Sequence, residues 1–180
     1  MPIKTFSGKK IKIRELAKSD LKNVKKFQNY INSLIKEDAK IILNKKETLK
    51  EEAEWIKNKI KKARKREDIL LIAECDNKII GTTNIELKEG RLDHIGEFGI
   101  SILKGYRGIG LGGYLTGEII KLAKEKLKAK LKIIRLFCFS NNKSAINLYK
   151  KFDFKIKARL PKQIQYKGKL VDELIMLLFL

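Results

Sequence analysis

The spacing of apolar residues predicts one strand and two helices in the first third of the chain. Residues 10–16 alternate isoleucine with charged side chains, the period of two that is typical of a half-buried strand. Ser19 is the expected N-cap of a first helix, whose apolar residues recur at intervals of three and four over residues 21–35. A second amphipathic helix is predicted over residues 48–66, because its leading threonine and Glu51 form a capping box.

The pattern then changes to that of a β-meander. Residues 69–75 form a short apolar run, and residues 78–87 return as its partner strand. Asp and Asn at 76–77 can supply the positive φ angles of a tight hairpin turn. A second turn is expected at 89–90, followed by a third strand over residues 94–103.

The last part of the chain alternates helices and strands. A long helix is predicted over residues 108–130, then a strand over 132–139, a helix over 143–152, and strands over 154–160 and 170–180. The strand, helix and strand that centre on the long helix should form a right-handed parallel crossover, whereas the hairpins are antiparallel. The expected fold class is therefore α+β (mixed α/β), with a mixed sheet of about seven strands flanked by about four helices.

Length and composition limit the class of protein. The chain has 180 residues, of which 43% are hydrophobic and 35% charged, too apolar for a disordered chain and too rich in charge for a membrane protein. Residues 1–12 contain no secretory segment, and the longest apolar run, 174–180, is only strand-sized. Cys75 and Cys138 lack CxxC spacing and are expected in the core. We therefore expect one cytoplasmic domain over residues 1–180, without a metal or a membrane contact.

The formal net charge of +21 has two interpretations. It can reflect a polyanionic partner such as RNA or the ribosome, or a compositional preference for lysine, which is spread over almost every segment. The densest basic run, residues 57–66, lies late in the second predicted helix, where cations suit the negative end of the helix dipole. Composition is the preferred explanation, and a polyanionic partner stays open.

A glycine-rich loop over residues 105–113 joins the third strand of the meander to the long helix. Each glycine inside a helix costs roughly 1 kcal/mol relative to alanine, so the cluster needs a compensating role. Glycines let backbone N–H groups approach a phosphate at the positive end of the helix dipole. The alternative is close packing of the helix on the sheet, which we prefer only for Gly117.

The loop does not match every phosphate-binding motif. A Walker A loop would need Gly-Lys-Ser/Thr, whereas this loop ends in Gly112-Gly113-Tyr114. A dinucleotide fingerprint would place an acidic residue at the end of a following strand, but Glu125 lies in the same predicted helix. The pyrophosphate of coenzyme A is the third option.

Two motifs resemble those of the GNAT acyltransferases. Arg107-Gly-Ile-Gly-Leu-Gly112 matches the R/Q-x-x-G-x-G/A acetyl-CoA loop of that family. Thirty-five residues after Arg107, Asn142-Lys-Ser-Ala-Ile-Asn-Leu-Tyr149 resembles the N-x-x-A-x-x-L-Y helix, followed by Phe154 of the terminal Gly-Phe pair. The resemblance extends over almost the whole chain, because the order of elements is also the GNAT order. It implies the bent mixed sheet of the GNAT fold and an acetyl-CoA-dependent N-acetyltransferase.

Other features are similar to one branch of that superfamily, which includes the ribosomal-protein N-terminal acetyltransferases. They are Ile13-Arg14 with Asp20, the Tyr106-Arg107 pair, and Tyr166-x-Gly168-x-x-x-Asp172-x-x-x-Met176. One position departs from the family pattern, because Asp153 replaces the glycine before the final phenylalanine. Aspartate tolerates the left-handed conformation, so we expect the turn to survive at a modest cost.

The resemblance implies a site for acetyl-CoA. The strand carrying residues 98–103 would separate from its parallel neighbour near residues 136–139, with pantetheine in the gap. Backbone groups near Ile100 and Ile102 would pair with the pantetheine amides, and a main-chain N–H could polarise the thioester carbonyl. The expected cofactor-binding residues, with no metal among the ligands, are Ile100, Ile102, Arg107, Gly108, Ile109, Gly110, Leu111, Gly112, Gly113 and Asn142.

The same resemblance suggests catalytic residues. Tyr149 matches the family's proton donor to the leaving thiolate, and its alternative is an apolar helix position. Glu97 occupies the strand position where many relatives place a glutamate base, although a structural ion pair with a lysine is nearly as good an explanation. Glu86 on the neighbouring strand is the reserve base, and His94 is expected at the surface.

The acceptor amine stays open on sequence grounds. At pH 7 an α-amine costs about 1 to 1.4 kcal/mol to deprotonate and a lysine about 4.6 kcal/mol, so a weak or water-mediated base suffices for a peptide or protein N-terminus. Repulsion by the +21 surface also disfavours polyamines and basic tails, so the α-amine is placed ahead of small amines. Acidic residues near the junction of the first two helices can reverse the positive surface field locally: Glu37, Asp38, Glu47, Glu51, Glu52 and Glu54. The alternatives are a small-molecule amine acetyltransferase and a non-catalytic basic module, as a monomer or a homodimer.

Overall fold

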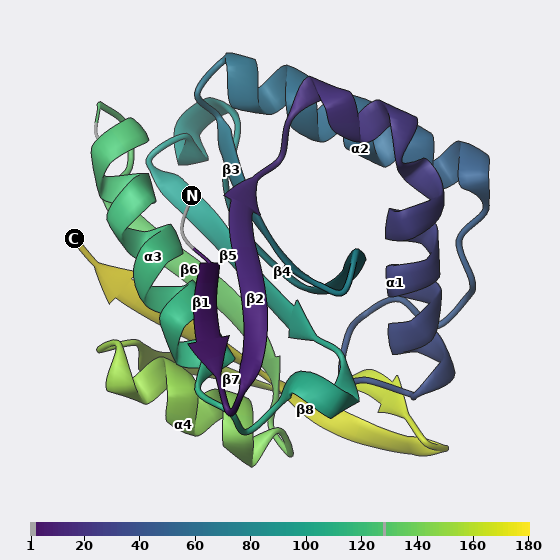
Figure 1. The fold of residues 1–180 in the computed structure, drawn as a ribbon. Coiled ribbons are helices and arrows are strands. Elements are labelled where there is room, and N and C mark those ends of the chain that lie inside the picture. Colours follow the sequence, from purple (N-terminus) through teal and green to yellow (C-terminus); the bar gives the residue numbers. More distant parts are fainter. Residues whose placement is uncertain (1–2, 128) are drawn as a thin grey trace.

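The computed structural model describes residues 3–127 and 129–180 and shows one mixed sheet with helices on both faces (Figure 1). The strand order in the eight-stranded sheet is β1-β2-β3-β4-β5-β6-β8-β7. The strands are β1 (Ile3–Phe6), β2 (Lys9–Glu15), β3 (Asp68–Cys75), β4 (Lys78–Leu87), β5 (Ile95–Ile102), β6 (Ile133–Phe139), β7 (Lys155–Tyr166) and β8 (Lys169–Phe179). The helices are α1 (Val24–Lys36), α2 (Leu49–Arg64), α3 (Leu111–Lys126) and α4 (Lys143–Lys151).

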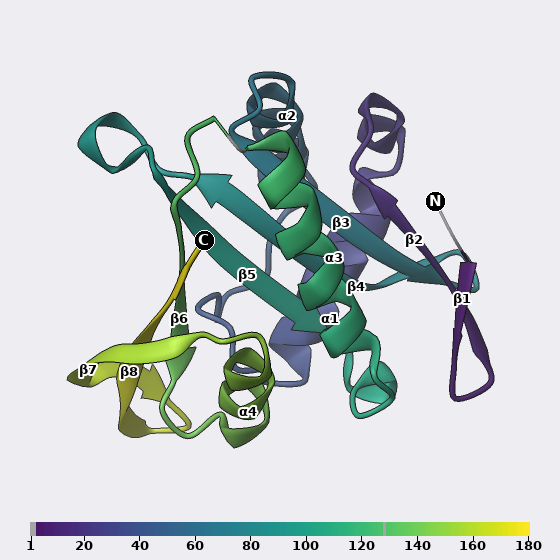
Figure 2. The ribbon, with the colours of Figure 1, turned by 90° about the vertical axis from the view of Figure 1, so that its left-hand side faces the viewer.

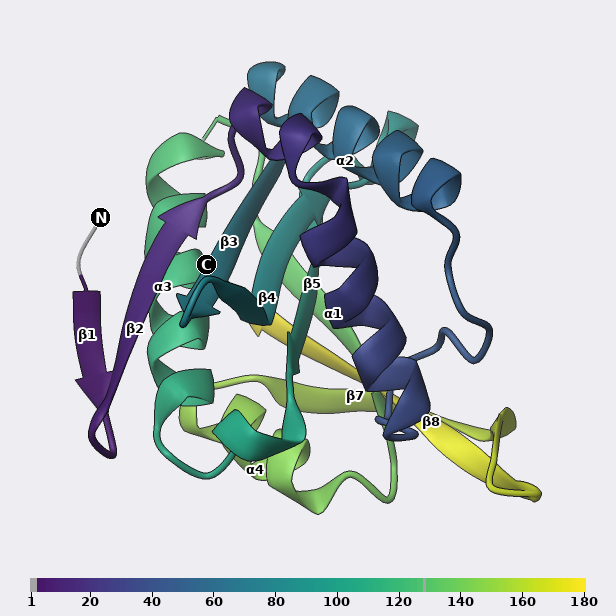
Figure 3. The ribbon, with the colours of Figure 1, turned by 45° about the vertical axis from the view of Figure 1, so that its right-hand side comes forward.

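The helices divide the core into layers. Figure 3 shows α1 and α2 on one face of the central strands and α3 on the other. The α1–α2 layer buries Phe27, Leu34 and Ile56 against the sheet. The α3 layer buries Ile119 and Ala123 in the largest apolar cluster, a loss of water contact that stabilises the fold. No helix in the described part of the chain is long and apolar enough to cross a membrane.

The sheet consists of two halves joined at β5 and β6. Figure 2 shows β6, β7 and β8, with α4, turned away from the half that contains β3, β4 and β5. All neighbouring pairs are antiparallel except β5 and β6, which are parallel. Gly96 is required at this junction, because a Cβ there would lie 2.6 Å from Ile85 and 2.7 Å from Leu131. The predicted parallel crossover and mixed sheet are confirmed.

The start of the first helix differs from the prediction. Ser19 does not cap it: residues Lys18–Lys22 form a short 3-10 helix, and α1 begins only at Val24. Asp20, which is 1% exposed, accepts hydrogen bonds from the Ala17 backbone N–H and from Arg14. The Asp20 carboxylate therefore fixes this corner, through a contact that apolar spacing does not reveal.

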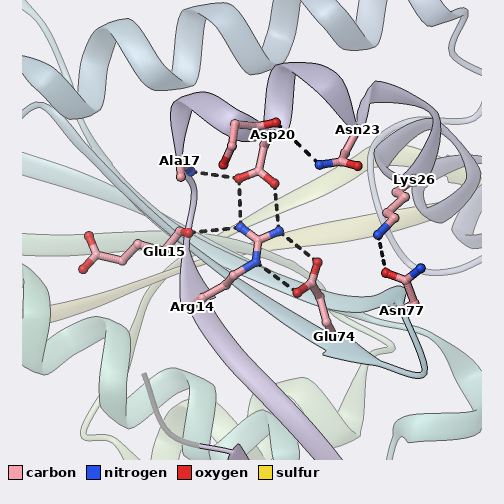
Figure 4. A network of polar contacts seen from close by, with 9 residues as sticks. Arg14, Glu15, Ala17, Asp20, Asn23, Lys26, Glu74 and Asn77 are labelled. Atoms are coloured by element: carbon pink, nitrogen blue, oxygen red, sulfur yellow. Dashed lines mark hydrogen bonds and ion pairs between the residues drawn. The ribbon is translucent and has the colours of Figure 1, made fainter.

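Arg14 connects β2 to the nearby turn at Asp20 and to Glu74 of β3, which is sixty residues away in the sequence (Figure 4). Its guanidinium donates to both oxygens of Asp20 at 2.8 Å, and to both oxygens of Glu74 at 3.0 and 2.8 Å. It also donates to the carbonyl of Glu15 at 3.2 Å. These bidentate contacts anchor β2 to β3 and to the turn that leads into α1.

The structure confirms the predicted turns but changes the bounds of some helices and strands. The hairpin turn is confirmed, because Asp76 and Asn77 have φ angles of 48° and 61°. Asp153 has a φ of 64°, so it adopts the left-handed conformation expected of it. The long helix was predicted over residues 108–130, but α3 is shorter at both ends. The first strand of the last hairpin was predicted to end at residue 160, but β7 continues to Tyr166. The short strand β1, which pairs with β2, was not predicted.

Candidate active site

The two halves of the sheet separate where β5 and β6 leave each other. Only three residue pairs join these strands, and the last is Glu97 with Arg135. Beyond it β5 stays paired with β4 as far as Ile102, and β6 stays paired with β8 as far as Phe139. The gap therefore opens toward the carboxyl ends of β5 and β6, as the sequence resemblance implied.

Backbone polar groups of β5 face this gap. Leu103 N–H donates to Ile80 O and Lys88 N–H to Ile95 O, so the odd-numbered residues of β5 pair with β4. The groups of Phe98, Ile100 and Ile102 consequently point toward β6. The side chain of Arg107 already uses one of them, because its Nε–H donates to Ile102 O at 2.6 Å.

The glycine loop leads from β5 to the N-terminus of α3. Gly108 and Gly110 have φ angles of 77° and 89°, and Gly110 is the N-cap of α3. Tyr114 N–H makes the first helical bond, to Gly110 O, so the N–H groups of residues 111–113 have no acceptor within the helix. Such N–H groups at a helix N-terminus are suited to bind an anion.

This geometry corrects the sequence argument about the glycines. Gly108 and Gly110 lie before the helix, and they are needed for positive φ, not to offset a helical cost. Gly112 lies in the first turn, where a Cβ would be 3.4 Å from Leu148 and 3.5 Å from Ile102. Gly117 faces Phe152 at the end of α4 and not the sheet, and a Cβ there would lie at an ordinary contact distance of 3.4 Å.

A cavity of about 1270 Å³ connects the gap between the strands with the glycine loop and the α1–α2 layer. Most of the residues expected to bind the cofactor line it: Ile100, Ile102, Arg107, Gly108, Gly110, Gly112, Gly113 and Asn142. Ile109 and Leu111 do not, and both pack in the apolar cluster beneath the loop. Asn142 is the N-cap of α4, so the N-termini of two helices adjoin the cavity.

Tyr149 projects from α4 into the cavity wall. It is 7% exposed, and its ring packs edge-on against Phe98 with a centroid distance of 5.7 Å. Its hydroxyl has no hydrogen-bond partner among the residues that the structure describes. Burial raises the pKa of the Tyr149 phenol above its ordinary value, and the nearby Cys138 adds to this. The phenol therefore keeps its proton at neutral pH.

The carboxylates nominated as bases lie outside the cavity wall. Glu97 is engaged by Lys88 at 3.2 Å and Arg135 at 3.5 Å. Glu86 binds Lys59 at 2.5 Å and Lys62 at 2.6 Å beneath α2, and these lysines lower its pKa to about 2 against the opposing effect of burial. His94 lies in the turn before β5 and also does not line the cavity. None of the three is directed at the gap.

Contacts between distant segments form the far side of the cavity. Tyr166 of β7 donates its hydroxyl to Asp38 O at 2.8 Å, and Lys167 pairs with the Asp38 carboxylate at 3.4 Å. Lys40 Nζ donates to Asn141 O at 2.7 Å, which links the segment after α1 to the start of α4. This side holds five of the six predicted acidic residues, because Glu54 points elsewhere on α2.

Several lining residues were not identified from the sequence. Tyr30 of α1 donates to Ser101 O at 2.8 Å, and Asn84 and Glu173 line the cavity from β4 and β8. Trp55, the one tryptophan in the chain, lines it from α2. A single tryptophan in an amphipathic helix rich in charged residues was the feature of the sequence that could have identified it.

Comparisons with known proteins agree with this geometry. A sequence model of the acetyltransferase (GNAT) family matches residues 31–154. The L-amino acid N-acetyltransferase AaaT of Escherichia coli (strain K12) is 29% identical over 103 residues, which are 57% of this chain and 62% of AaaT. The chain thus matches less than two thirds of the length of that relative.

Two solved structures show the same fold. The ribosomal-protein-alanine N-acetyltransferase of Brucella melitensis superposes with a TM-score of 0.78 at 20% identity, covering 94% of this chain and 99% of the other. The acetyltransferase yncA of Salmonella typhimurium, solved with its cofactor acetyl-CoA, gives a TM-score of 0.76 at 18% identity, covering 94% and 93%. Because the family model spans more than half of the sequence, this chain belongs to the acetyltransferase (GNAT) family.

Proposed function

We propose that the chain transfers an acetyl group from acetyl-CoA to a primary amine, preferably the α-amine of a peptide or protein N-terminus. The observation that carries the proposal is the separation of β5 from β6 after the pair of Glu97 and Arg135. It leaves backbone groups of β5 facing a cavity that also contains Tyr149 and the N-terminus of α3. Family membership supports the same reaction.

The residues present fit the cosubstrate. The free N–H groups of residues 111–113 and the dipole of α3 would hold the pyrophosphate, and the N–H of Ile100 would pair with an amide of pantetheine. Arg107 is held by Ile102 O and by Glu37, so it supports the loop from the side. The thioester supplies the acetyl group, and a main-chain N–H of β5 would stabilise the negative charge that develops on its carbonyl oxygen.

Tyr149 would move one proton. Its neutral phenol donates to the departing sulfur, and the nitrogen of the new amide returns a proton to the phenolate, directly or through water. The raised pKa favours this return, because a buried phenolate is poorly stabilised. An α-amine near pKa 8 needs only about 1.4 kcal/mol to lose its proton at pH 7, so water can take it.

The Tyr149→Phe variant tests this role. We expect kcat for thiol release from acetyl-CoA to fall about 100-fold, the usual contribution of a general acid, with CoA affinity unchanged. Tyr114→Phe is the matched control, because the ring of Tyr114 packs edge-on against Phe6 and does not line the cavity. An unchanged kcat for Tyr149→Phe would remove this residue from the mechanism.

A small-molecule amine is the second candidate acceptor, and the similarity to AaaT favours it. Peptides with free N-termini, L-amino acids and diamines, each offered with acetyl-CoA, separate the two candidates by the rate of thiol release. Release with amino acids and not with peptides would make the small-molecule function the correct one. If no amine causes thiol release although CoA binds, acetyl transfer is refuted.

A further inference from the structure

Glu52 is a buried carboxylate without a partner. It lies in the first turn of α2 and is 6% exposed. No side chain among the described residues forms an ion pair or hydrogen bond with its carboxylate. Glu52 lines the cavity, and its oxygens are not fully enclosed: among the described residues, the fully enclosed side-chain atoms without a partner are Asp68 Oδ1 and Arg135 Nε.

Large apolar side chains lie beside Glu52. Phe27 of α1 and Trp55 of α2 line the same part of the cavity, with ring centroids 6.5 Å apart, and Ile56 is fully buried one turn further along α2. A carboxylate in such a place has lost most of its contact with water without gaining a hydrogen bond from the protein, which is unfavourable unless a ligand supplies one. Burial, and then the charge of Glu47, raise the pKa of Glu52 to about 7.

Some charged side chains on the cavity wall are paired with each other, and others are not. Its acidic side chains are Glu37, Asp38, Glu47, Glu51, Glu52 and Glu173, and its basic ones are Lys40, Lys104, Arg107 and Lys167. Arg107 pairs with Glu37 and Lys167 with Asp38, while Lys40 donates to Asn141 O. The part of the wall around Glu52 is therefore acidic, although the whole chain carries +21.

We propose that Glu52 is the acceptor-binding residue of this site: its carboxylate pairs with the ammonium of an amine that has an apolar neighbouring group and no carboxylate next to the nitrogen. The inference rests on the proposed function, because the amine is an acceptor only if the chain transfers an acetyl group. It narrows the acceptor to N-terminal amines, amino acid amides and monoamines. Free amino acids are disfavoured, because their own carboxylate would face Glu47 and Glu52.

Two probes that differ in a single group test the assignment. L-phenylalaninamide and L-phenylalanine share the amine and the ring, but only the second carries a carboxylate. Both are offered to the wild type, to Glu52→Gln and to Glu54→Gln, with thiol release giving kcat/KM. Glu54 provides the matched control, because it is exposed on the same helix and loses the same charge.

We expect the wild type to prefer the amide, and this preference to fall about tenfold in Glu52→Gln and to stay unchanged in Glu54→Gln. The difference between the amine pKa values of the two probes cancels, because it affects all three proteins equally. A preference in Glu52→Gln within twofold of the wild type would overturn the assignment.

Equilibrium binding keeps this test separate from that of acetyl transfer. Trp55 is the only tryptophan and lines the cavity three residues from Glu52, so its fluorescence reports amide binding without turnover. Weaker binding of L-phenylalaninamide by about tenfold in Glu52→Gln supports the site even if no amine is acetylated. Equal binding by both proteins, or no binding by the wild type, refutes it.

Discussion

Replacing Glu52 with glutamine should make the folded protein more stable above about pH 4.5, with the full gain reached near pH 7. Below pH 4.5 the carboxyl is neutral in both the unfolded and the folded state, so glutamine changes little. Between pH 4.5 and about 7 the unfolded chain releases the proton while the folded chain retains it. The free energy of unfolding of the wild type therefore falls as the pH rises through this range.

The pKa values set the size of the effect. A rise of the pKa of Glu52 from 4.5 to about 7 corresponds to about 3 kcal/mol, at about 1.4 kcal/mol for each pKa unit. This is an upper value, because the carboxylate borders a cavity that admits water. For a chain of this length, each kcal/mol raises Tm by about 2–4 °C.

Urea unfolding at pH 4.5, 6 and 8 measures the effect, with Glu54→Gln as the control for loss of one acidic charge from α2. We expect Glu52→Gln to match the wild type at pH 4.5 and to exceed it by up to about 3 kcal/mol at pH 8. A gain that is the same at every pH would show that folding does not raise the pKa of Glu52, and a loss of stability at pH 8 would show that Glu52 has a favourable partner in the folded state.

Two further substitutions probe the glycine loop and the Arg14 network. Gly110→Ala forces a non-glycine residue to a φ of 89°, so we expect about 1–2 kcal/mol of destabilisation and weaker CoA binding by calorimetry. Gly105→Ala is its control, since no positive φ is needed there and a Cβ would meet nothing within 4 Å. Equal CoA affinity of both variants would exclude the strain argument. Arg14→Met leaves the buried Asp20 without its guanidinium, so urea unfolding at pH 7 should show a loss of about 3 kcal/mol, and a loss below about 1 kcal/mol would contradict the role of the network.

The amino-acid sequence determined the elements whose signals are local. The capping box of Thr48 and Glu51 forms as predicted, and so does the turn at Asp76 and Asn77. Such features depend on residues within three or four positions of each other, and a chain pattern reveals them directly. The start of α1 was missed because the Asp20 carboxylate accepts hydrogen bonds from the Ala17 N–H and from Arg14, polar contacts that the spacing of apolar residues does not reveal.

Some features of the candidate site could likewise be predicted from short segments of the sequence, and others could not. The glycine loop and the Asn142 to Tyr149 motif could be read from the sequence, because backbone geometry and helix N-termini are encoded in short segments. The sequence also indicated acidic residues that line the cavity near α1 and α2, but it did not show that the nominated base lies outside the cavity wall. Glu97 is held by Lys88 and Arg135 at the base of β5, outside the cavity wall.

The resemblance implied a gap between β5 and β6, but only the tertiary structure decided that their pairing ends at Glu97 and Arg135, and that Glu52 is buried without a partner. Both results depend on how the two halves of the sheet and the α1–α2 layer pack together, over separations of tens of residues. Burial and charge pairing are properties of that packing, so they alter the chemistry of a side chain without leaving a trace in its local sequence.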